Sequence, residues 1–129
     1  MKVLIADDSL TIRKIVTNVL LEMGYLKEHL YEAPDGAKAW NLICQQKFDL
    51  LLTDWNMPLM SGLELVKKTR TISKSNKQLP IIMITTEGSK EEVLEALKAG
   101  VSNYVVKPFN KDILKTKIED TIKKASFML

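Results

Sequence analysis

Val3-Leu4-Ile5-Ala6-Asp7-Asp8-Ser9 is a run of four apolar residues that ends in two acids and a serine. A short continuous apolar run of this kind is typical of a strand buried on both faces, as in a parallel sheet. A helix is predicted after it, because apolar residues recur there at helical spacing and Gly24 stands where a left-handed C-terminal cap is expected. These apolar residues are Ile12, Ile15, Val16, Val19, Leu20 and Met23. The chain therefore begins with a buried strand, a polar loop and an amphipathic helix.

The same alternation of strand and helix recurs four more times along the chain. Further strands are predicted at residues 30–33, 48–53, 81–84 and 104–106. Helices are predicted from Asp35-Gly36 onwards, at residues 63–70 and 90–99, and after Asn110, with a polar connector at residues 73–78. Five strands, each followed by a helix, predict an α/β fold with a doubly wound, five-stranded parallel sheet and five helices.

Length and composition favour one globular domain over residues 1–129. The chain is 46% hydrophobic and 27% charged, as in ordinary soluble proteins, and its net charge of +3 is too small to predict a nucleic-acid partner. Cys44, the only cysteine, excludes an intramolecular disulfide and is expected to be buried; the lone His29 is expected in a surface loop. No apolar segment is long enough for a signal peptide or a membrane span, so we expect a cytoplasmic protein that does not contact membranes.

Five polar residues stand at the ends of the predicted strands. They are Asp7 and Asp8 after the first strand, Asp54 after the third, Thr85 after the fourth and Lys107 after the fifth. The carboxyl ends of parallel strands meet at one edge of the sheet, where ligands of such folds bind, so we expect these side chains to converge. Three carboxylates close together repel one another unless a cation or protons compensate. Mg²⁺ suits such an oxygen-only cluster, which offers no Cys or His ligand.

Asp54 is the candidate nucleophile of this cluster, because a carboxylate can attack phosphorus and form an aspartyl phosphate. Its charge has to approach an anionic phosphoryl group. The metal ion and the ammonium group of Lys107 are therefore needed to offset the negative charge of the transferring oxygens, and Thr85 offers a hydroxyl donor to another of them. Caps and turns could account for any one of these residues, but independent caps need not gather at one edge of one sheet.

Four segments, taken in order and at their spacing, resemble the bacterial response-regulator receiver domain over essentially the whole chain. They are Leu4 to Ser9, Asp54-Trp55-Asn56-Met57-Pro58 with Gly62, Ile84-Thr85, and Lys107-Pro108-Phe109. Within that family the likeness is to the single-domain chemotaxis regulators. The resemblance implies the strand order 2-1-3-4-5, known for this fold, and a cis bond before Pro108. It also implies a monomer without an output domain, which catalyses only its own phosphoryl transfer and slow dephosphorylation.

Carried over residue by residue, the resemblance implies a phosphorylation site built around Mg²⁺. Asp54 would be the phosphoacceptor. Asp8, Asp54 and the backbone carbonyl of Asn56 would ligate Mg²⁺, while Asp7 would act mainly through water. Lys107 would pair with the phosphoryl group. These roles agree with the chemistry that the residue types themselves indicate.

The resemblance also implies how phosphorylation is transmitted. Thr85 and Tyr104 correspond to a switch pair, in which the hydroxyl moves to the phosphate and the aromatic ring turns inward. The change would be sensed on the face formed by the fourth helix, the fifth strand and the fifth helix. The partner contacts expected on that face are Lys90, Val93, Tyr104, Val106 and Lys117. The implied partners are a sensor histidine kinase of the chemotaxis type, a flagellar motor switch protein and a phosphatase; Ser89 stands where the chemotaxis pattern has lysine.

Other functions share parts of this pattern. A haloacid-dehalogenase-type phosphatase also uses a strand-end aspartate with Thr, Lys and Mg²⁺, but it carries Asp-x-Asp, and Asn56 cannot supply the second carboxylate that makes hydrolysis fast. Glu87 could orient a water, but an exposed acid at the start of a helix is the simpler interpretation. A flavodoxin-like carrier would accept phosphate in its first loop, where Asp7 and Asp8 repel it. A receiver of a phosphorelay or kinase-feedback pathway stays open as an alternative to motor control.

Overall fold

The computed structural model describes residues 1–72 and 74–127 and contains one five-stranded parallel sheet. Its strand order is β2-β1-β3-β4-β5, as the resemblance predicted. The strands are Val3–Ala6 (β1), Leu30–Ala33 (β2), Leu50–Thr53 (β3), Ile81–Thr85 (β4) and Asn103–Val106 (β5). β1, β3 and β4 are buried along their whole length, which is why they stand out in the sequence as continuous apolar runs.

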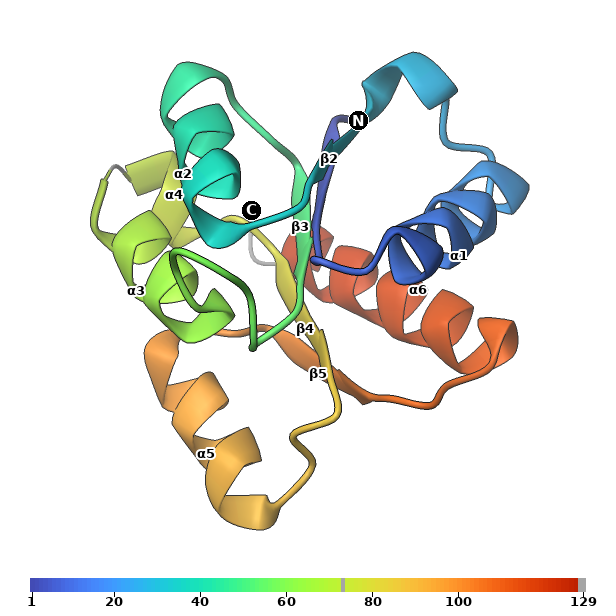
Figure 1. The fold of residues 1–129 in the computed structure, drawn as a ribbon. Coiled ribbons are helices and arrows are strands. Elements are labelled where there is room, and N and C mark those ends of the chain that lie inside the picture. Colours follow the sequence, from blue (N-terminus) through green and yellow to red (C-terminus); the bar gives the residue numbers. More distant parts are fainter. Residues whose placement is uncertain (73, 128–129) are drawn as a thin grey trace.

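Helices cover both faces of the sheet (Figure 1). One face carries α1 (Leu10–Glu22) and α6 (Lys111–Phe127), and the other carries α2 (Gly36–Gln45), α3 (Gly62–Ile72) and α5 (Lys90–Ala99). These five helices follow the five strands as predicted. Two short elements were not predicted, the 3-10 helix η1 (Lys27–His29) and α4 (Lys74–Lys77). α4 lies in the stretch expected to be a polar connector, of which Ser73 is outside the described residues.

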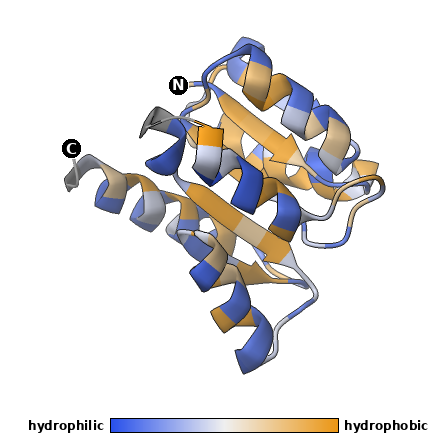
Figure 2. Cartoon of the chain, turned by 90° about the vertical axis from the view of Figure 1, so that its left-hand side faces the viewer, coloured by the Kyte–Doolittle hydropathy of each residue, from blue (hydrophilic) through white to orange (hydrophobic). Residues whose placement is uncertain are grey.

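Each face of the sheet packs on its helices through a separate hydrophobic cluster. Successive strand residues point to opposite faces, so β1 contributes to both clusters. Val3 and Ile5 pack with α1 and α6, whereas Leu4 and Ala6 pack with α2, α3 and α5. Figure 2 shows the strands as apolar along their length and the helices as alternately apolar and polar. This pattern is the amphipathicity expected of helices that cover a buried sheet.

Ile15, one of the apolar residues at helical spacing, and Cys44, which was expected to be buried, both lie at the surface. Ile15 is 41% exposed, and the Cys44 thiol is exposed. Val16, which follows Ile15 in α1, is buried, and so is Ile43, which precedes Cys44 in α2. One residue turns the helix by about 100°, and at Ile15 and Cys44 this turn places the side chain outside the buried face. The phase of the helix, not the residue type, decides burial at these two positions.

The helix ends follow the expected capping chemistry. Ser9 caps α1 by accepting a hydrogen bond from the Ile12 N–H at 3.2 Å, and Asn110 caps α6 by accepting one from the Ile113 N–H at 2.8 Å. Gly24 and Gly100 both have positive φ, at 98° and 115°, as the predicted left-handed ends of α1 and α5 require.

Arg70, near the end of α3, joins three separate segments of the chain. Its guanidinium donates to the carbonyl of Gly100 at 2.5 and 3.0 Å, to that of Leu79 at 2.6 Å and to that of Asn76 at 2.9 Å. These hydrogen bonds tie α3 to α4, to the connection between α4 and β4, and to the turn after α5. Burial of the side chain lowers the pKa of Arg70 from its usual value, yet the group stays charged at any physiological pH.

Candidate functional site

The acidic residues predicted at the carboxyl edge of the sheet lie together. Asp7 and Asp8 follow β1 and Asp54 follows β3, and these two strands are neighbours, with Ala6 opposite Thr53. One carboxylate oxygen from each aspartate lies within 4.8 Å of those of the other two. Asp7 and Asp54 are 2% and 8% exposed, whereas Asp8 is exposed. We call Asp7, Asp8 and Asp54 the acidic cluster; it is open to solvent on the side of Asp8.

Lys107 reaches the acidic cluster from the end of β5. Its Nζ donates to Oδ2 of Asp7 at 3.0 Å and to Oδ2 of Asp54 at 3.1 Å, and its bond to Pro108 is cis, as predicted. Burial disfavours the ammonium ion, but the hydrogen bond to Asp7 and the negative charge of Asp54 outweigh it and raise the pKa of Lys107. Lys107 is therefore protonated at neutral pH. One positive charge then faces three carboxylates, which leaves the site with excess negative charge.

The donor atoms of this site fit a hard divalent cation such as Mg²⁺. The side chains of the acidic cluster offer carboxylate oxygens, and the predicted Asn56 ligand is a carbonyl oxygen. Asp7 is already engaged on both oxygens, since Oδ1 accepts the Ser9 N–H at 2.9 Å and Oδ2 accepts Lys107. Among the described residues nothing donates to the Asp8 carboxylate, so it is the freest ligand. Asp54 is engaged in the same way, by the Trp55 N–H at 2.7 Å and by Lys107 at 3.1 Å. The division of direct and water-mediated contacts between Asp7 and Asp54 therefore stays a prediction, as does the Asn56 carbonyl as a ligand.

Gly62 allows α3 to begin against the backbone of Asp54. Its N–H donates to the carbonyl of Trp55 at 2.7 Å, and a Cβ at this position would lie only 1.8 Å from the carbonyl oxygen of Asp54. No side chain fits in that space. The glycine therefore permits the close contact that fixes the Asp54 backbone, while the Trp55 N–H donates to Asp54 Oδ1 at 2.7 Å and orients its carboxylate.

The loop between β3 and α3 contains one unusual backbone position. Leu59 has a φ of 69° and its side chain is 82% exposed. The Met60 N–H donates to the carbonyl of Pro58 at 2.8 Å, which closes a three-residue turn around Leu59. A leucine in this region of φ is strained, because its Cβ crowds the following carbonyl. The strain lies five residues from Asp54, in the loop that Gly62 terminates.

The two predicted switch residues are connected through the backbone of Glu87. The Glu87 N–H donates to Oγ1 of Thr85 at 3.3 Å, and the Tyr104 hydroxyl donates to the Glu87 carbonyl. Thr85 is fully buried and Tyr104 is 9% exposed, so the tyrosine ring is turned inward. Burial, with the charges of Glu92 and Glu87, raises the pKa of Tyr104 to about 12. Since Thr85 only accepts in this contact, its own hydroxyl hydrogen is left for another acceptor.

The side chain of Glu87 corrects the interpretation of this residue as an exposed acid at the start of a helix. Glu87 is half-buried and lies before α5, which begins at Lys90. Its Oε1 accepts the side-chain amide of Asn56 at 2.8 Å. Glu87 thus connects the loop after β3 with the segment after β4. Sequence reasoning gave no signal for this contact, because the two residues lie 31 positions apart and neither has a diagnostic neighbour.

The residues expected to contact a partner lie on α5, β5 and α6. Lys90 is exposed, Val93 and Lys117 are half-buried, and Val106 is 44% exposed. Ser89 has a structural role here, because its side chain accepts the Glu92 N–H at 3.1 Å and the two residues form the capping box of α5. The surface of these three elements also exposes large apolar side chains, at Leu94, Leu97, Val106 and Ile113.

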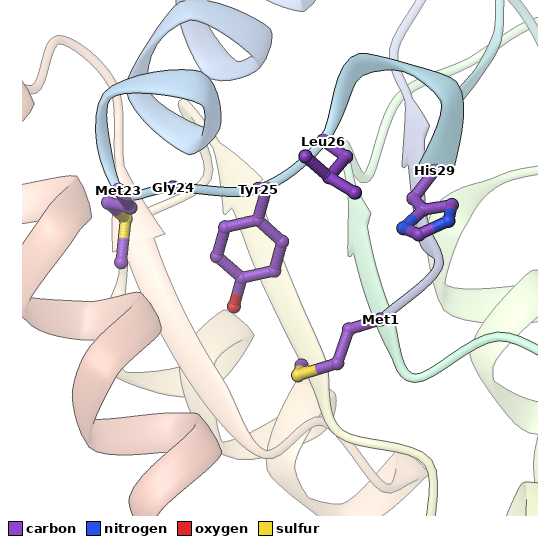
Figure 3. A pocket seen from close by; sticks show the side chains of 6 residues that line it. All are labelled: Met1, Met23, Gly24, Tyr25, Leu26 and His29. Atoms are coloured by element: carbon purple, nitrogen blue, oxygen red, sulfur yellow. The ribbon is translucent and has the colours of Figure 1, made fainter.

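A shallow pocket of about 340 Å³ lies at the other end of α1 from the acidic cluster (Figure 3). It is lined by Met1, Met23, Gly24, Tyr25, Leu26 and His29. His29, expected in a surface loop, is half-buried at the end of η1. The pocket contains no acid, and burial raises the pKa of Tyr25, with the charge of Asp49 adding to the effect. Its lining shares no residue with the acidic cluster.

Comparison with known proteins defines the class to which this fold and site belong. A family model described as "Response regulator receiver domain" matches residues 3–119, and the chain belongs to this family. In the part of the chain that the structure describes, no helix combines the length and apolar character of a membrane span.

Chemotaxis proteins are among the most similar members of the family. A "Chemotaxis protein CheY homolog" of Campylobacter jejuni is 51% identical over 123 residues, which cover 95% of this chain and 92% of the relative. "Chemotaxis protein CheY1" of Helicobacter pylori is 54% identical over 120 residues, covering 92% of this chain and 94% of the relative. The solved structure of the chemotaxis response regulator CheY4 of Vibrio cholerae superposes with a TM-score of 0.85 at 38% identity, covering 93% of this chain and 97% of that one. The chain is thus a receiver domain that resembles the CheY chemotaxis proteins.

Proposed function

We propose that residues 1–129 act as one receiver domain, the phosphoryl-accepting response regulator of a two-component system. The observation that carries this proposal is the acidic cluster at the carboxyl edge of the sheet, with Lys107 Nζ between Asp7 and Asp54. A partly buried group of like charges destabilises the fold, so the acidic cluster is best understood as a binding site for a cation and an anionic group. Membership of the receiver family supports the same conclusion.

Asp8, Asp54 and the Asn56 carbonyl would hold Mg²⁺, with Asp7 acting through water. The bound ion supplies positive charge beside the oxygens of the phosphoryl group during transfer. Lys107 supplies the second positive charge, because it already lies 3.1 Å from Asp54 Oδ2. Thr85 donates its free hydroxyl hydrogen to a phosphoryl oxygen.

Phosphoryl transfer requires a nucleophilic oxygen of Asp54 and a phosphorylated donor. The carboxylate oxygen attacks phosphorus and forms a new O–P bond, while the P–N bond of a phosphohistidine breaks. The electron pair of that bond leaves on the imidazole nitrogen, which takes up a proton from water. With acetyl phosphate as donor, the P–O bond breaks and acetate leaves. The product in both cases is an aspartyl phosphate on Asp54.

The switch residues would carry this event to the partner face. A phosphoryl oxygen that accepts the Thr85 hydroxyl draws this side chain towards Asp54 and so alters its contact with the Glu87 N–H. The Glu87 carbonyl holds Tyr104 turned inward on the other side. Tyr104 already holds the inward position that the resemblance assigns to the phosphorylated form, so phosphorylation would stabilise this position. It would favour the arrangement of α5, β5 and α6 that presents Lys90, Val93, Tyr104, Val106 and Lys117 to a partner.

The partners that this proposal names follow from the chemotaxis relatives. A cytoplasmic sensor histidine kinase would phosphorylate Asp54, the flagellar motor switch protein would bind the phosphorylated form, and a phosphatase would reverse the reaction. The chain would act as a monomer in the cytoplasm and as a switch, not as an enzyme with an external substrate.

Intact-mass spectrometry tests the proposal. Incubation with Mg²⁺ and acetyl phosphate should add one phosphoryl group to the protein, and Asp54→Asn should abolish the addition. Asp49→Asn is the matched control, because Asp49 is an exposed aspartate that precedes β3 at the opposite edge of the sheet. If the Asp54→Asn protein gained a phosphoryl group to the same extent as the wild type, a residue other than Asp54 would be the phosphoacceptor. Rapid release of phosphate over many turnovers, without a stable adduct, would instead support a phosphatase of the haloacid-dehalogenase type.

A further inference from the structure

Arg13, in the first turn of α1, makes a contact that no part of the proposed chemistry uses. Its side chain is only 13% exposed, and its Nη1 donates to the backbone carbonyl of Asp7 at 2.6 Å. Its Nε donates to Oε1 of Glu32 at 2.9 Å. Glu32 is on β2, opposite Ile5 of β1, so the guanidinium spans from the second strand to the loop that carries the acidic cluster.

The carbonyl that Arg13 contacts belongs to the peptide unit between Asp7 and Asp8. A peptide unit is planar, so fixing the direction of its C=O also fixes the direction of its N–H and the position of the next Cα. Asp8 is exposed, and among the described residues its carboxylate has no hydrogen-bond or ion-pair partner. The orientation of the Asp8 side chain therefore depends on the backbone that precedes it, which Arg13 holds.

The other groups of Asp7 are fixed independently of Arg13. Its N–H donates to the Ala33 carbonyl at 3.0 Å, and its two carboxylate oxygens accept from Ser9 and Lys107. The backbone carbonyl of Asp7 is the only other polar group of this residue, and it accepts a hydrogen bond from Arg13. A charged donor at 2.6 Å makes a strong hydrogen bond, and a side chain that is largely buried and anchored on Glu32 has little freedom to leave it.

We propose that Arg13, oriented by Glu32, is a positioning residue for the metal site: it holds the Asp7–Asp8 peptide so that the Asp8 carboxylate faces Asp54. This inference rests on the proposed function, because it concerns the affinity of the acidic cluster for Mg²⁺. Arg13 does not contact the metal ion or the phosphoryl group in this role. It acts through the backbone, as outer partners of metal ligands do.

Electrostatics alone predicts the opposite effect, which makes the inference testable. Arg13 carries a positive charge close to the cation site, so removing that charge should by itself strengthen Mg²⁺ binding. Loss of the hydrogen bond to Asp7 should weaken it. For Arg13→Gln we expect Mg²⁺ affinity to fall about tenfold, the lower end of the effect seen when outer partners of metal ligands are removed.

The experiment is a Mg²⁺ titration of the full chain by isothermal titration calorimetry, repeated by the change in tryptophan emission, for wild type, Arg13→Gln, Glu32→Gln and Lys14→Gln. Lys14 is the matched control, because it is an exposed positive residue next to Arg13 on α1. We expect weaker binding in Arg13→Gln and, to a smaller degree, in Glu32→Gln, with no weakening in Lys14→Gln. A double variant with both Arg13→Gln and Glu32→Gln should bind Mg²⁺ with the same affinity as Arg13→Gln alone, since Glu32 acts through Arg13. Urea unfolding without Mg²⁺ establishes that each variant is folded at the titration temperature.

Equal or tighter Mg²⁺ binding by folded Arg13→Gln would overturn the inference and leave the proposed function intact. Additive losses in the double variant would also overturn it, because they would mean that Glu32 acts independently. If Arg13→Gln does not fold, the Mg²⁺ affinity of Glu32→Gln becomes the test, and an affinity equal to that of the wild type refutes the inference. Failure of the proposed function gives a different result, the absence of Mg²⁺ binding by the wild-type chain itself.

Discussion

Replacing Asp7 by Asn should make the metal-free protein more stable, although it removes a predicted site residue. Asp7 is 2% exposed, and its carboxylate lies within 4.8 Å of carboxylate oxygens of Asp8 and Asp54. Asn has nearly the same shape and can still accept the Ser9 N–H, now 2.9 Å from Oδ1. The substitution therefore removes one charge from a crowded site while disturbing the packing little.

The expected gain follows from the distances. At an effective dielectric constant of about 20, each repulsion across 4.8 Å is about 3.5 kcal/mol, and the attraction to Lys107 Nζ across 3.0 Å is about 5.5 kcal/mol. The two repulsions together exceed the attraction by about 1–2 kcal/mol, and the cost of burying a carboxylate adds to the same side. Because Asp8 is exposed, solvent screens its share and the charge terms then roughly cancel, so the expected net gain of about 1 kcal/mol comes from the cost of burying the carboxylate.

The gain should depend on pH in a definite direction. Burial raises the pKa of Asp7 in the folded protein, so ionisation of this group destabilises the fold at pH values above that raised pKa. Below the unfolded-state pKa of about 3.9 the carboxyl is neutral in both states and the penalty vanishes. The advantage of Asp7→Asn should be complete at pH 7 and disappear as the pH falls towards that value.

Urea unfolding in EDTA, followed by tryptophan emission at neutral and acidic pH, measures the effect. Asp120→Asn is the control, because Asp120 is an exposed aspartate on α6. Saturating Mg²⁺ should reduce or reverse the advantage of Asp7→Asn, since a ligand stabilises the state that binds it more tightly. A loss of stability at pH 7 in EDTA, or a gain of the same size at acidic pH, would refute the electrostatic argument.

Three further substitutions test other features of the site. Gly62→Ala should destabilise the protein by about 2–3 kcal/mol in urea unfolding, because its Cβ would lie 1.8 Å from the Asp54 carbonyl oxygen; an unchanged midpoint would contradict that close contact. Leu59→Asn should stabilise the protein by about 0.5–1 kcal/mol in the same assay, because Asn tolerates a φ of 69° better than Leu does, whereas Leu59→Ala should give no such gain. Tyr104→Phe should remove an ionisation with a pKa of about 12 from an absorbance titration at alkaline pH. The raised pKa of Tyr104 contributes stability that is fully present below the unfolded-state pKa of about 10 and is lost as the pH rises through the folded-state pKa of about 12. Over this pH range the wild type should therefore lose more stability than Tyr104→Phe does.

The fold and the centre of the site could be predicted because both follow from local sequence patterns. Continuous apolar runs such as Val3–Ala6 indicate buried parallel strands, and the geometry of a parallel sheet brings the residues after such strands to one edge. The convergence of the carboxylates of Asp7, Asp8 and Asp54 was therefore predictable and is confirmed. The strand order came from the resemblance to a family, since apolar runs carry no information about which strands are neighbours.

The remaining contacts could not be predicted, because they depend on tertiary geometry. Arg13 donates to a backbone carbonyl, an acceptor that every residue possesses and that leaves no mark in the sequence. The pairing of Asn56 with Glu87 needs two loops to meet. The burial of Cys44 was predicted from its residue type and was wrong, because the phase of α2 turns it outward.

The position of Arg70 determines where α5 can move. Its guanidinium holds the Gly100 carbonyl at the carboxyl end of this helix. The amino end follows the segment from Thr85 to Ser89, which contacts both switch residues through Glu87. One end of α5 is thus fastened and the other adjoins the phosphorylation site, so the helix should behave as a lever with its fulcrum at Gly100. A shift that starts beside Asp54 would then displace the amino end of the helix most, and the displacement would decrease along the helix towards Gly100.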